Sequence, residues 1–232
     1  MRRVLPDLPR LAFIAALLCG SALITISSLA SLDPDTLSAF VIEKLPVRFE
    51  ALWLGALRVH LVAAAVALPA CALLLTRTLQ RRLTLHRWLG RITGGVVLLA
   101  LVPSGAILAF EATGGLPSTV GFLLSGGLVA VFMVRGIVAA RRHHVQAHRR
   151  ATWHVLAQMS VAVSSRVLLF GFEAAGLEPE LAYVIALWLP VVVSAVAVEV
   201  LSRSLLTERI RREARPVVTR GALAPAFARL GR

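Results

Sequence analysis

The sequence is poor in the residues on which soluble enzymes and disulfide-stapled domains depend. Only 16% of its 232 residues are charged, and it contains one tyrosine, two cysteines and a single lysine, Lys44. Cys19 and Cys71 are too few for a disulfide framework and lack the spacing of metal ligands, so we expect both to be buried and unreactive. A phosphate-binding glycine loop, a GxSxG elbow, an HExxH helix and paired CxxC motifs are also missing. Soluble catalysis is therefore not expected, and neither an enzyme activity nor a metal site is predicted.

Apolar residues are abundant instead. They make up 58% of the chain, and the mean hydropathy is +0.81. Six apolar runs are long enough to cross a bilayer, which takes about 20 residues of helix. The predicted spans cover residues 11–32, 52–76, 89–110, 116–138, 152–173 and 181–203. We therefore predict an all-α integral membrane six-helix bundle in residues 1–206, and we see no internal repeat. A basic tail follows in residues 207–232, whose first turns are expected to extend the sixth helix and whose remainder is expected to be disordered.

The charged residues predict how the bundle is oriented. A net charge of +13 would suggest nucleic-acid binding in a soluble protein. Here 21 of the 25 basic residues fall in the N-terminal segment, the loops 77–91 and 135–150 and the tail from 203, whereas eight of the 12 acidic residues fall on the other side. The positive-inside rule then places both termini in the cytoplasm. The expected partners are the lipid bilayer and anionic phospholipids at the arginine clusters, and no nucleic acid.

Two segments near the N-terminus allow further predictions. Residues 11–32 resemble a signal peptide, because Ser28 and Ala30 occupy positions −3 and −1 of a possible cleavage site. Their apolar stretch is longer than a typical signal core, so a retained helix is favoured. Residues 34–50 are too polar to span. Their apolar spacing, including Leu37 and Phe40, predicts a short amphipathic helix on the outer surface.

Arg166 lies inside an apolar run, where a permanent cation must be hydrated or paired. It precedes Glu173 by seven residues, which places it roughly 10 Å from the outer end of its helix, since a helix rises about 1.5 Å per residue. His60 follows Glu50 by ten residues, roughly 15 Å at the same rise. Both side chains are therefore expected in the outer half of the bilayer at comparable depth.

These depths predict an outer polar site that binds an acidic or carbonyl-bearing ligand. Its candidate residues are His60, Arg166, Arg58, Glu111 and Glu173. The alternative is that Arg166 bonds helix-end carbonyls and Glu173 and only joins helices together. His60 lies on the same stripe of its helix as the small residues Ala67 and Cys71. Such a stripe is more typical of helix packing than of a cofactor site.

The other five histidines are expected on the cytoplasmic side. A bis-histidine haem needs two imidazoles at the same depth on facing helices. His60 has no histidine partner in its leaflet, which excludes an outer haem of this kind. On the inner side, His86 could face His154, with His148 as a substitute, and these three are the candidate ligands of a haem b. The alternative is that they are interface histidines among arginines that contact lipid phosphates.

The segments around these histidines carry a family resemblance. The run Leu85-His86-Arg87-Trp88-Leu89-Gly90-Arg91 opens the third span, and His148-Arg149-Arg150 opens the fifth, 18 residues before Arg166. With His60, this combination resembles the bacterial multi-pass membrane proteins of domain-of-unknown-function family 2306 (DUF2306) over residues 55–205. The residues matching the family's characteristic positions are His60, His86, Arg91, His148 and Arg166.

The resemblance implies a fold and a bacterial inner-membrane location but no activity. The chain departs from the family at Ala151, where the family tends to have tryptophan, and at His154, where it tends to have arginine. The second departure counts against His154 as a ligand common to the family. The segment from Leu85 to Gly90 also resembles the LHSWLG-type segment of cytochrome b561 electron carriers, which use one haem in each leaflet.

Three functions remain open from the sequence. The first is a haem- or quinone-linked transmembrane redox protein with inner histidine ligands and the outer polar site. The second is a small transporter or a module that binds an anionic lipid or ligand through Arg166. The third is an assembly partner of another membrane protein, without chemistry of its own. Fold alone does not choose among them.

Overall fold

The computed structural model describes residues 8–32 and 39–213, which are helical apart from short connections. In these residues six helices are long and apolar enough to cross a membrane, as the sequence predicts. The elements are α1 (Leu8–Ser28), η1 (Leu29–Ser31), α2 (Ala39–Lys44), α3 (Glu50–Leu74), α4 (Arg77–Arg81), α5 (Leu83–Val96), η2 (Val97–Leu101), α6 (Val102–Ala109), α7 (Gly115–Arg141), α8 (Val145–Ala174) and α9 (Pro179–Glu213).

The chain divides into two compact units, and the division falls within α9, after Val198. The second unit begins at Glu199, whose carboxylate accepts a 2.9 Å hydrogen bond from Arg203 Nε one turn later. The sixth helix, α9, continues to Glu213, so the first turns of the predicted tail extend it as expected. Residues 214–232, where disorder was expected, lie outside the described residues.

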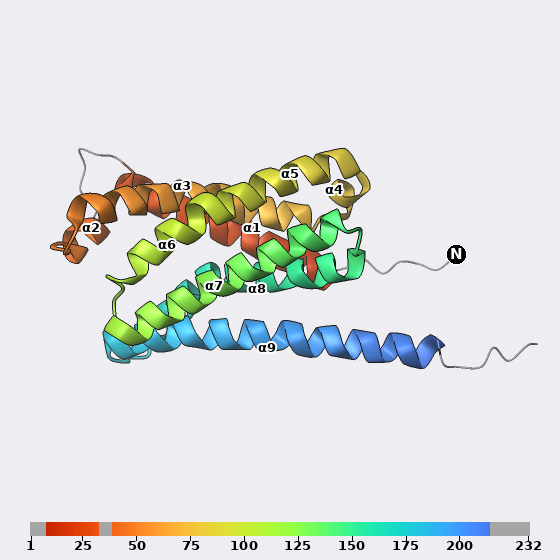
Figure 1. Cartoon of the computed structure of the whole chain (residues 1–232). Helices are drawn as coiled ribbons and strands as arrows, with labels where there is room; N and C mark the ends of the chain where they lie inside the picture. Colours follow the sequence, from red (N-terminus) through yellow and green to blue (C-terminus); the bar gives the residue numbers. More distant parts are fainter. Residues whose placement is uncertain (1–7, 33–38, 214–232) are drawn as a thin grey trace, which may run out of the picture. The chain divides into compact units, whose positions relative to one another are not determined.

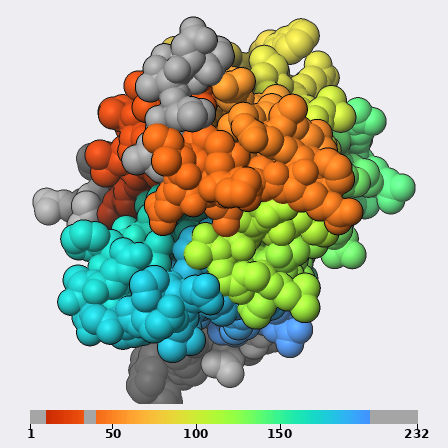
Figure 2. All heavy atoms as spheres, turned by 90° about the vertical axis from the view of Figure 1, so that its left-hand side faces the viewer, coloured from red at the N-terminus to blue at the C-terminus, as the bar shows by residue number. Residues whose placement is uncertain are grey.

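Within the first unit, the long helices run back and forth between two ends (Figure 1). The acidic end holds the start of α3, the junction of α6 with α7 and the junction of α8 with α9. Figure 2 shows this end from outside, with these three parts of the chain facing the viewer. The arginine end holds α4, the start of α5 and the connection between α7 and α8. The acidic and arginine ends correspond to the two sides that the charge pattern of the sequence separates.

The main core lies where α1, α3 and α8 pack together. Small residues permit this, since an added methyl group on Gly20 of α1 would lie 2.5 Å from Val163 Cγ1 of α8. Ala67 and Cys71 of the predicted small-residue stripe are buried here, and the Cys71 thiol lies 3.6 Å from the Met159 sulfur. Cys19 is exposed, so its predicted burial is wrong: the lipid-facing side of a membrane helix accepts an apolar side chain as readily as the core does.

The third span is not a uniform α-helix. Its middle, Val97–Leu101, is a π-helix, and Pro103 follows at the start of α6. Proline has no backbone N–H to continue the ladder, and single π-turns inside α-helices are frequent at functional sites. The widened turn packs against α3.

The short helix expected in residues 34–50 is present as α2, although residues 33–38 lie outside the described part. Val41 is 2% exposed and packs with Trp53 and Leu57 of α3. The Phe40 ring stacks on Trp53 at a centroid distance of 6.2 Å. The amphipathic spacing therefore buries one side chain against α3, while Phe40 stays largely exposed.

A buried polar network joins α7, α8 and α9. Ser125 Oγ donates to Gln158 Oε1 at 3.0 Å, and Gln158 Nε2 donates to the Val191 carbonyl and to Ser194 Oγ, both at 3.1 Å. Gln158 is 3% exposed. A buried amide that satisfies both of its ends fixes the relative rotation of the three helices at this level.

Candidate functional site

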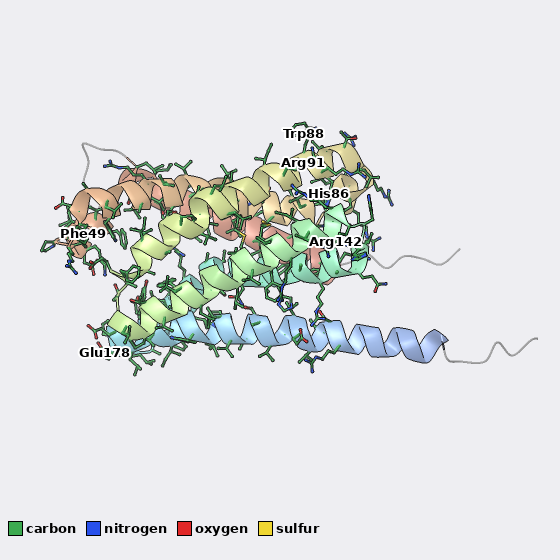
Figure 3. The ribbon with its side chains drawn as sticks, in the orientation of Figure 1. Phe49, His86, Trp88, Arg91, Arg142 and Glu178 are labelled. Carbon is green, nitrogen blue, oxygen red and sulfur yellow. The ribbon has the colours of Figure 1, made fainter. Side chains whose placement is uncertain are left out.

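Two histidines meet at the arginine end. His86 lies in the first turn of α5 and His148 in the first turn of α8, and Figure 3 shows His86, Arg91 and Arg142 at this end. The ring centroids of His86 and His148 are 6.5 Å apart, and the ring planes are at 89° to each other. Helices far apart in the sequence therefore bring two imidazoles to the same level.

The His148 ring is held by a backbone carbonyl. Its Nδ1 lies 2.9 Å from the Gly136 oxygen of α7, which can only accept, so Nδ1 carries the proton and Nε2 carries the lone pair. Metal-binding histidines are usually oriented in this way. His86 Nδ1 is buried and has no hydrogen-bond partner among the described residues. Both rings thus retain capacity to bind a metal ion.

His154 lies elsewhere. Six residues after His148, it is on a different face of α8, because each residue turns a helix by about 100°. It is 6% exposed and stacks flat on Phe132 of α7, with a centroid distance of 4.0 Å and an angle of 7°. The guanidinium of Arg135 lies 5.6 Å from the centre of the same phenyl ring. Of the two candidate partners for His86, the structure therefore brings His148 to it and packs His154 into the core.

Arg166 lies in the half of α8 nearer the acidic end. Its Nη1 donates a 2.7 Å hydrogen bond to the Ala162 carbonyl, one turn toward the helix N-terminus. Side chains on a helix lean in that direction. The direction also explains why Glu173, seven residues toward the C-terminus, is not its partner. Neither Glu173 nor Glu111 forms an ion pair with Arg166 in the part of the chain that the structure describes.

His60 binds the irregular part of the third span. Its Nδ1 lies 3.2 Å from the Leu101 carbonyl and 3.2 Å from Ser104 Oγ. The helices approach closely here, since an added Cβ on Gly105 would lie 3.1 Å from His60 Cε1. Because Nδ1 donates to a carbonyl, the neutral ring presents Nε2 as an acceptor. The charge of Arg166 acts on this imidazole, although burial is the larger influence on it.

Tyr183 is the functional candidate that the sequence argument missed. The charge of Arg166 also acts on its phenol group, which comes from the second turn of α9. Its ring is half-buried and lies 6.3 Å from the Phe122 ring. A tyrosine near a helix end is ordinarily an interface anchor, so its sequence signal is weak, although it is the only tyrosine in the chain. The charge of Arg166 therefore acts on polar groups of two other helices, while its one hydrogen bond stays within α8.

Arg58 forms no hydrogen bond with Arg166, Tyr183 or His60 among the described residues. It is half-buried in α3, and its Nε lacks a hydrogen-bond partner among the described residues. It lies two residues from His60, which places the two side chains on different faces of the helix. Of the other predicted site residues, His60 is the one on which the charge of Arg166 acts, whereas Arg58, Glu111 and Glu173 form no hydrogen bond or ion pair with Arg166 among the described residues.

The comparisons with known proteins bear on this geometry. A family model described as "Predicted membrane protein (DUF2306)" matches residues 57–202. The chain belongs to this family. No curated protein and no solved structure matches it. The DUF2306 region includes the histidine pair and the group around Arg166, so both candidate sites belong to the part of the chain that the family shares.

The described residues of this DUF2306 chain offer groups that can bind ligands. No group of three or more His, Cys, Asp or Glu side chains able to hold a metal ion occurs among the described residues. The histidine pair offers two nitrogen ligands and no third. Arg166 offers guanidinium donors, Tyr183 offers a phenol donor, and His60 offers an imidazole acceptor.

Proposed function

We propose that this multi-pass membrane protein binds one b-type haem between His86 and His148 and uses it to exchange single electrons. The observation that carries the proposal is the 6.5 Å separation of the two imidazole centroids. Two imidazole nitrogens that each lay about 2.0–2.1 Å from a shared metal ion would place their ring centres roughly 6 Å apart, so His86 and His148 would be the residues to hold the haem iron.

The number of ligands favours haem over a bare metal ion. Structural zinc takes four protein ligands and catalytic zinc takes three. The described residues offer only the two histidines here. A porphyrin supplies four nitrogens of its own and needs only axial ligands from the protein. The anchored Nδ1 of His148 would keep its Nε2 directed at the metal.

The surroundings supply room and charge for such a group. Gly90 lies one turn after His86 on the same face of α5, and an added Cβ there would have no atom within 4 Å. Arg91 and Arg142 lie at the same end (Figure 3). Arginines bind carboxylates in paired hydrogen bonds, so these two are the proposed partners of the haem propionates. A membrane quinone or a membrane protein partner would supply or accept the electron.

An absorption spectrum of the purified protein, oxidised and then reduced with dithionite, tests this proposal. Protein from haem-replete cells is expected to show a Soret band that shifts on reduction. His86→Ala and His148→Ala should each lose most of the bound haem. His144→Ala, in the loop before α8, is the matched control and should keep it. A colourless wild-type protein, or haem retained equally in all three variants, contradicts the proposal.

We also propose a location and an orientation, namely the bacterial inner membrane with both termini and the arginine end in the cytoplasm. The support is the charge asymmetry between the ends, because arginine-rich connections are retained on the cytoplasmic side. Anionic phospholipid head groups are the proposed partners of the exposed arginines at that end, which include Arg141, Arg142, Arg149 and Arg150.

A second candidate function is the binding of an acidic ligand. The observation that favours it is Arg166, which has no carboxylate partner in the described residues although it lies within a membrane-spanning helix. This candidate is independent of the histidine pair, which lies at the opposite end of the bundle.

A further inference from the structure

Arg166 carries a charge that the described part of the chain does not neutralise. Its one hydrogen bond goes to the carbonyl of Ala162 in its own helix, and a guanidinium has five N–H donors. Ionisable groups at membrane depth are costly and ordinarily face a partner, a cavity or a ligand. The remaining donors therefore need an acceptor from outside the described residues.

The surface around Arg166 faces lipid. Arg166 itself is exposed, and Val167 and Phe170 beside it are 67% and 76% exposed. Large apolar side chains at such exposure in a spanning helix are typical of contact with acyl chains. A ligand of Arg166 can thus approach sideways from the bilayer, with its apolar part against Val167 and Phe170. A small water-soluble anion has no such complementary surface.

The polar neighbours suit an acidic head group. A guanidinium fork binds carboxylate and phosphate oxygens, and it does so more strongly where water is excluded. The Tyr183 hydroxyl makes no hydrogen bond within the described residues and can donate a further one. His60 contributes its Nε2, the nitrogen not used by the Leu101 carbonyl, as an acceptor for the proton of a partly protonated acid.

We propose that Arg166 and Tyr183, with His60 beside them, form a lateral binding site for the acidic head group of a membrane amphiphile. The shared chemistry is a carboxylate or phosphate oxygen carried on an acyl chain. The site is distinct from the histidine pair, and it does not depend on haem being bound. It lies on one face of α8, opens toward lipid and takes its second donor from α9.

Binding is best measured on the full-length protein in nanodiscs of uncharged phosphatidylcholine, doped with either phosphatidylglycerol or oleate. Bound amphiphile is counted by native mass spectrometry, and the thermal shift is recorded in parallel. Inorganic phosphate, added alone, tests whether a water-soluble anion produces the same thermal shift. Wild type is expected to retain one phosphatidylglycerol or one oleate. Whichever is retained identifies the source of the acidic group.

The variants separate a site from a packing role. Arg166→Gln should weaken retention about tenfold or more, since hydrogen bonds to charged groups are the strong ones, and Tyr183→Phe should weaken it several-fold. Arg48→Gln removes an equal charge just before α3, where Arg48 lies over the Phe49 ring, and should leave retention unchanged. Arg166→Lys keeps the charge without the fork and is expected to fall between wild type and Arg166→Gln.

Three results would overturn the inference. The first is that neither amphiphile is retained by wild type. The second is that inorganic phosphate alone reproduces the thermal shift. The third is that Arg166→Gln loses stability equally in undoped phosphatidylcholine, which would make Arg166 a packing residue. If Arg166→Gln unfolds, retention by Tyr183→Phe decides instead, because this change leaves the half-buried ring in place.

Discussion

At the scale of single residues, polar groups inside the membrane spans differ in how many of their hydrogen-bonding atoms find a partner within the bundle. Gln158 satisfies both ends of its amide within the bundle, through Ser125 on one side and α9 on the other. Arg166 satisfies one donor on its own helix and leaves the rest. The first pattern is structural, and the second is the one from which a binding role for Arg166 is proposed.

Replacing Gln158 by leucine should weaken the packing of α8 against α7 and α9. Interhelical hydrogen bonds of this kind contribute about 0.6 to 2 kcal/mol each in membrane proteins, and here several are lost together with a buried Ser125 hydroxyl left unpaired. Reversible unfolding in mixed detergent should show a loss of about 1–3 kcal/mol on that basis. Ser160→Ala, which removes a hydroxyl bonded only to its own helix, is the control and should cost less. Equal losses in the two variants would contradict the structural assignment.

The sequence could predict some of these residues and not others. His60 and Arg166 could be selected from the sequence because helix rise converts position along a span into depth. Tyr183 could not, since depth does not say which faces of the helices meet. For the same reason the sequence favours His154 over His148 as the partner of His86, whereas the rotation of α8 brings His148 to it.

At the scale of elements, the connection from α8 to α9 is held by one carboxylate. The Glu178 carboxylate accepts from the backbone N–H groups of Glu180 and Leu181, at 3.0 and 2.8 Å. These two bonds hold the pKa of Glu178 below its ordinary value. Gly176, at φ +79°, makes the turn that precedes it. The cap therefore fixes the start of the helix that carries Tyr183.

The first turn of α9 should fray as the solution becomes acidic. Because the folded-state pKa of Glu178 is lowered, its stabilising effect is complete above the ordinary carboxyl pKa and is lost as the pH falls through the folded value. Amide hydrogen exchange at Glu180 and Leu181 should be slower in wild type than in Glu178→Gln at about pH 6, and the difference should vanish near pH 3 or below. Glu173→Gln is the control. A difference that persists unchanged in acid would contradict the role of the carboxylate.

Helix existence was easier to predict than helix regularity. Six apolar runs predicted six membrane helices because a span must satisfy its backbone internally and the apolar length is set by the bilayer. The π-helical turn at 97–101 has no comparable signal. Pro103 indicates an interruption but does not specify its form.

At the scale of the whole molecule, the separation of charge between the two ends predicts the orientation in the membrane. In a protein lacking its native cysteines, Ala175→Cys at the acidic end should react with an impermeant maleimide in intact cells. Arg142→Cys at the arginine end should react only after the inner membrane is permeabilised. Equal labelling of both denatured proteins controls for thiol reactivity. The reverse pattern would contradict the orientation proposed from the arginines.

The extra residue in the π-helical turn has a consequence for the whole span. A π turn absorbs one extra residue by widening, so the helix on either side keeps nearly the phase of a regular helix that is one residue shorter. Inserting or deleting a residue elsewhere between His86 and Ser104 has no such compensation and would rotate one half of the span against the other by about 100°. Ser104 would then turn away from His60 if His86 stayed paired with His148. A one-residue change outside residues 97–101 is therefore expected to disturb this bundle more than one inside them.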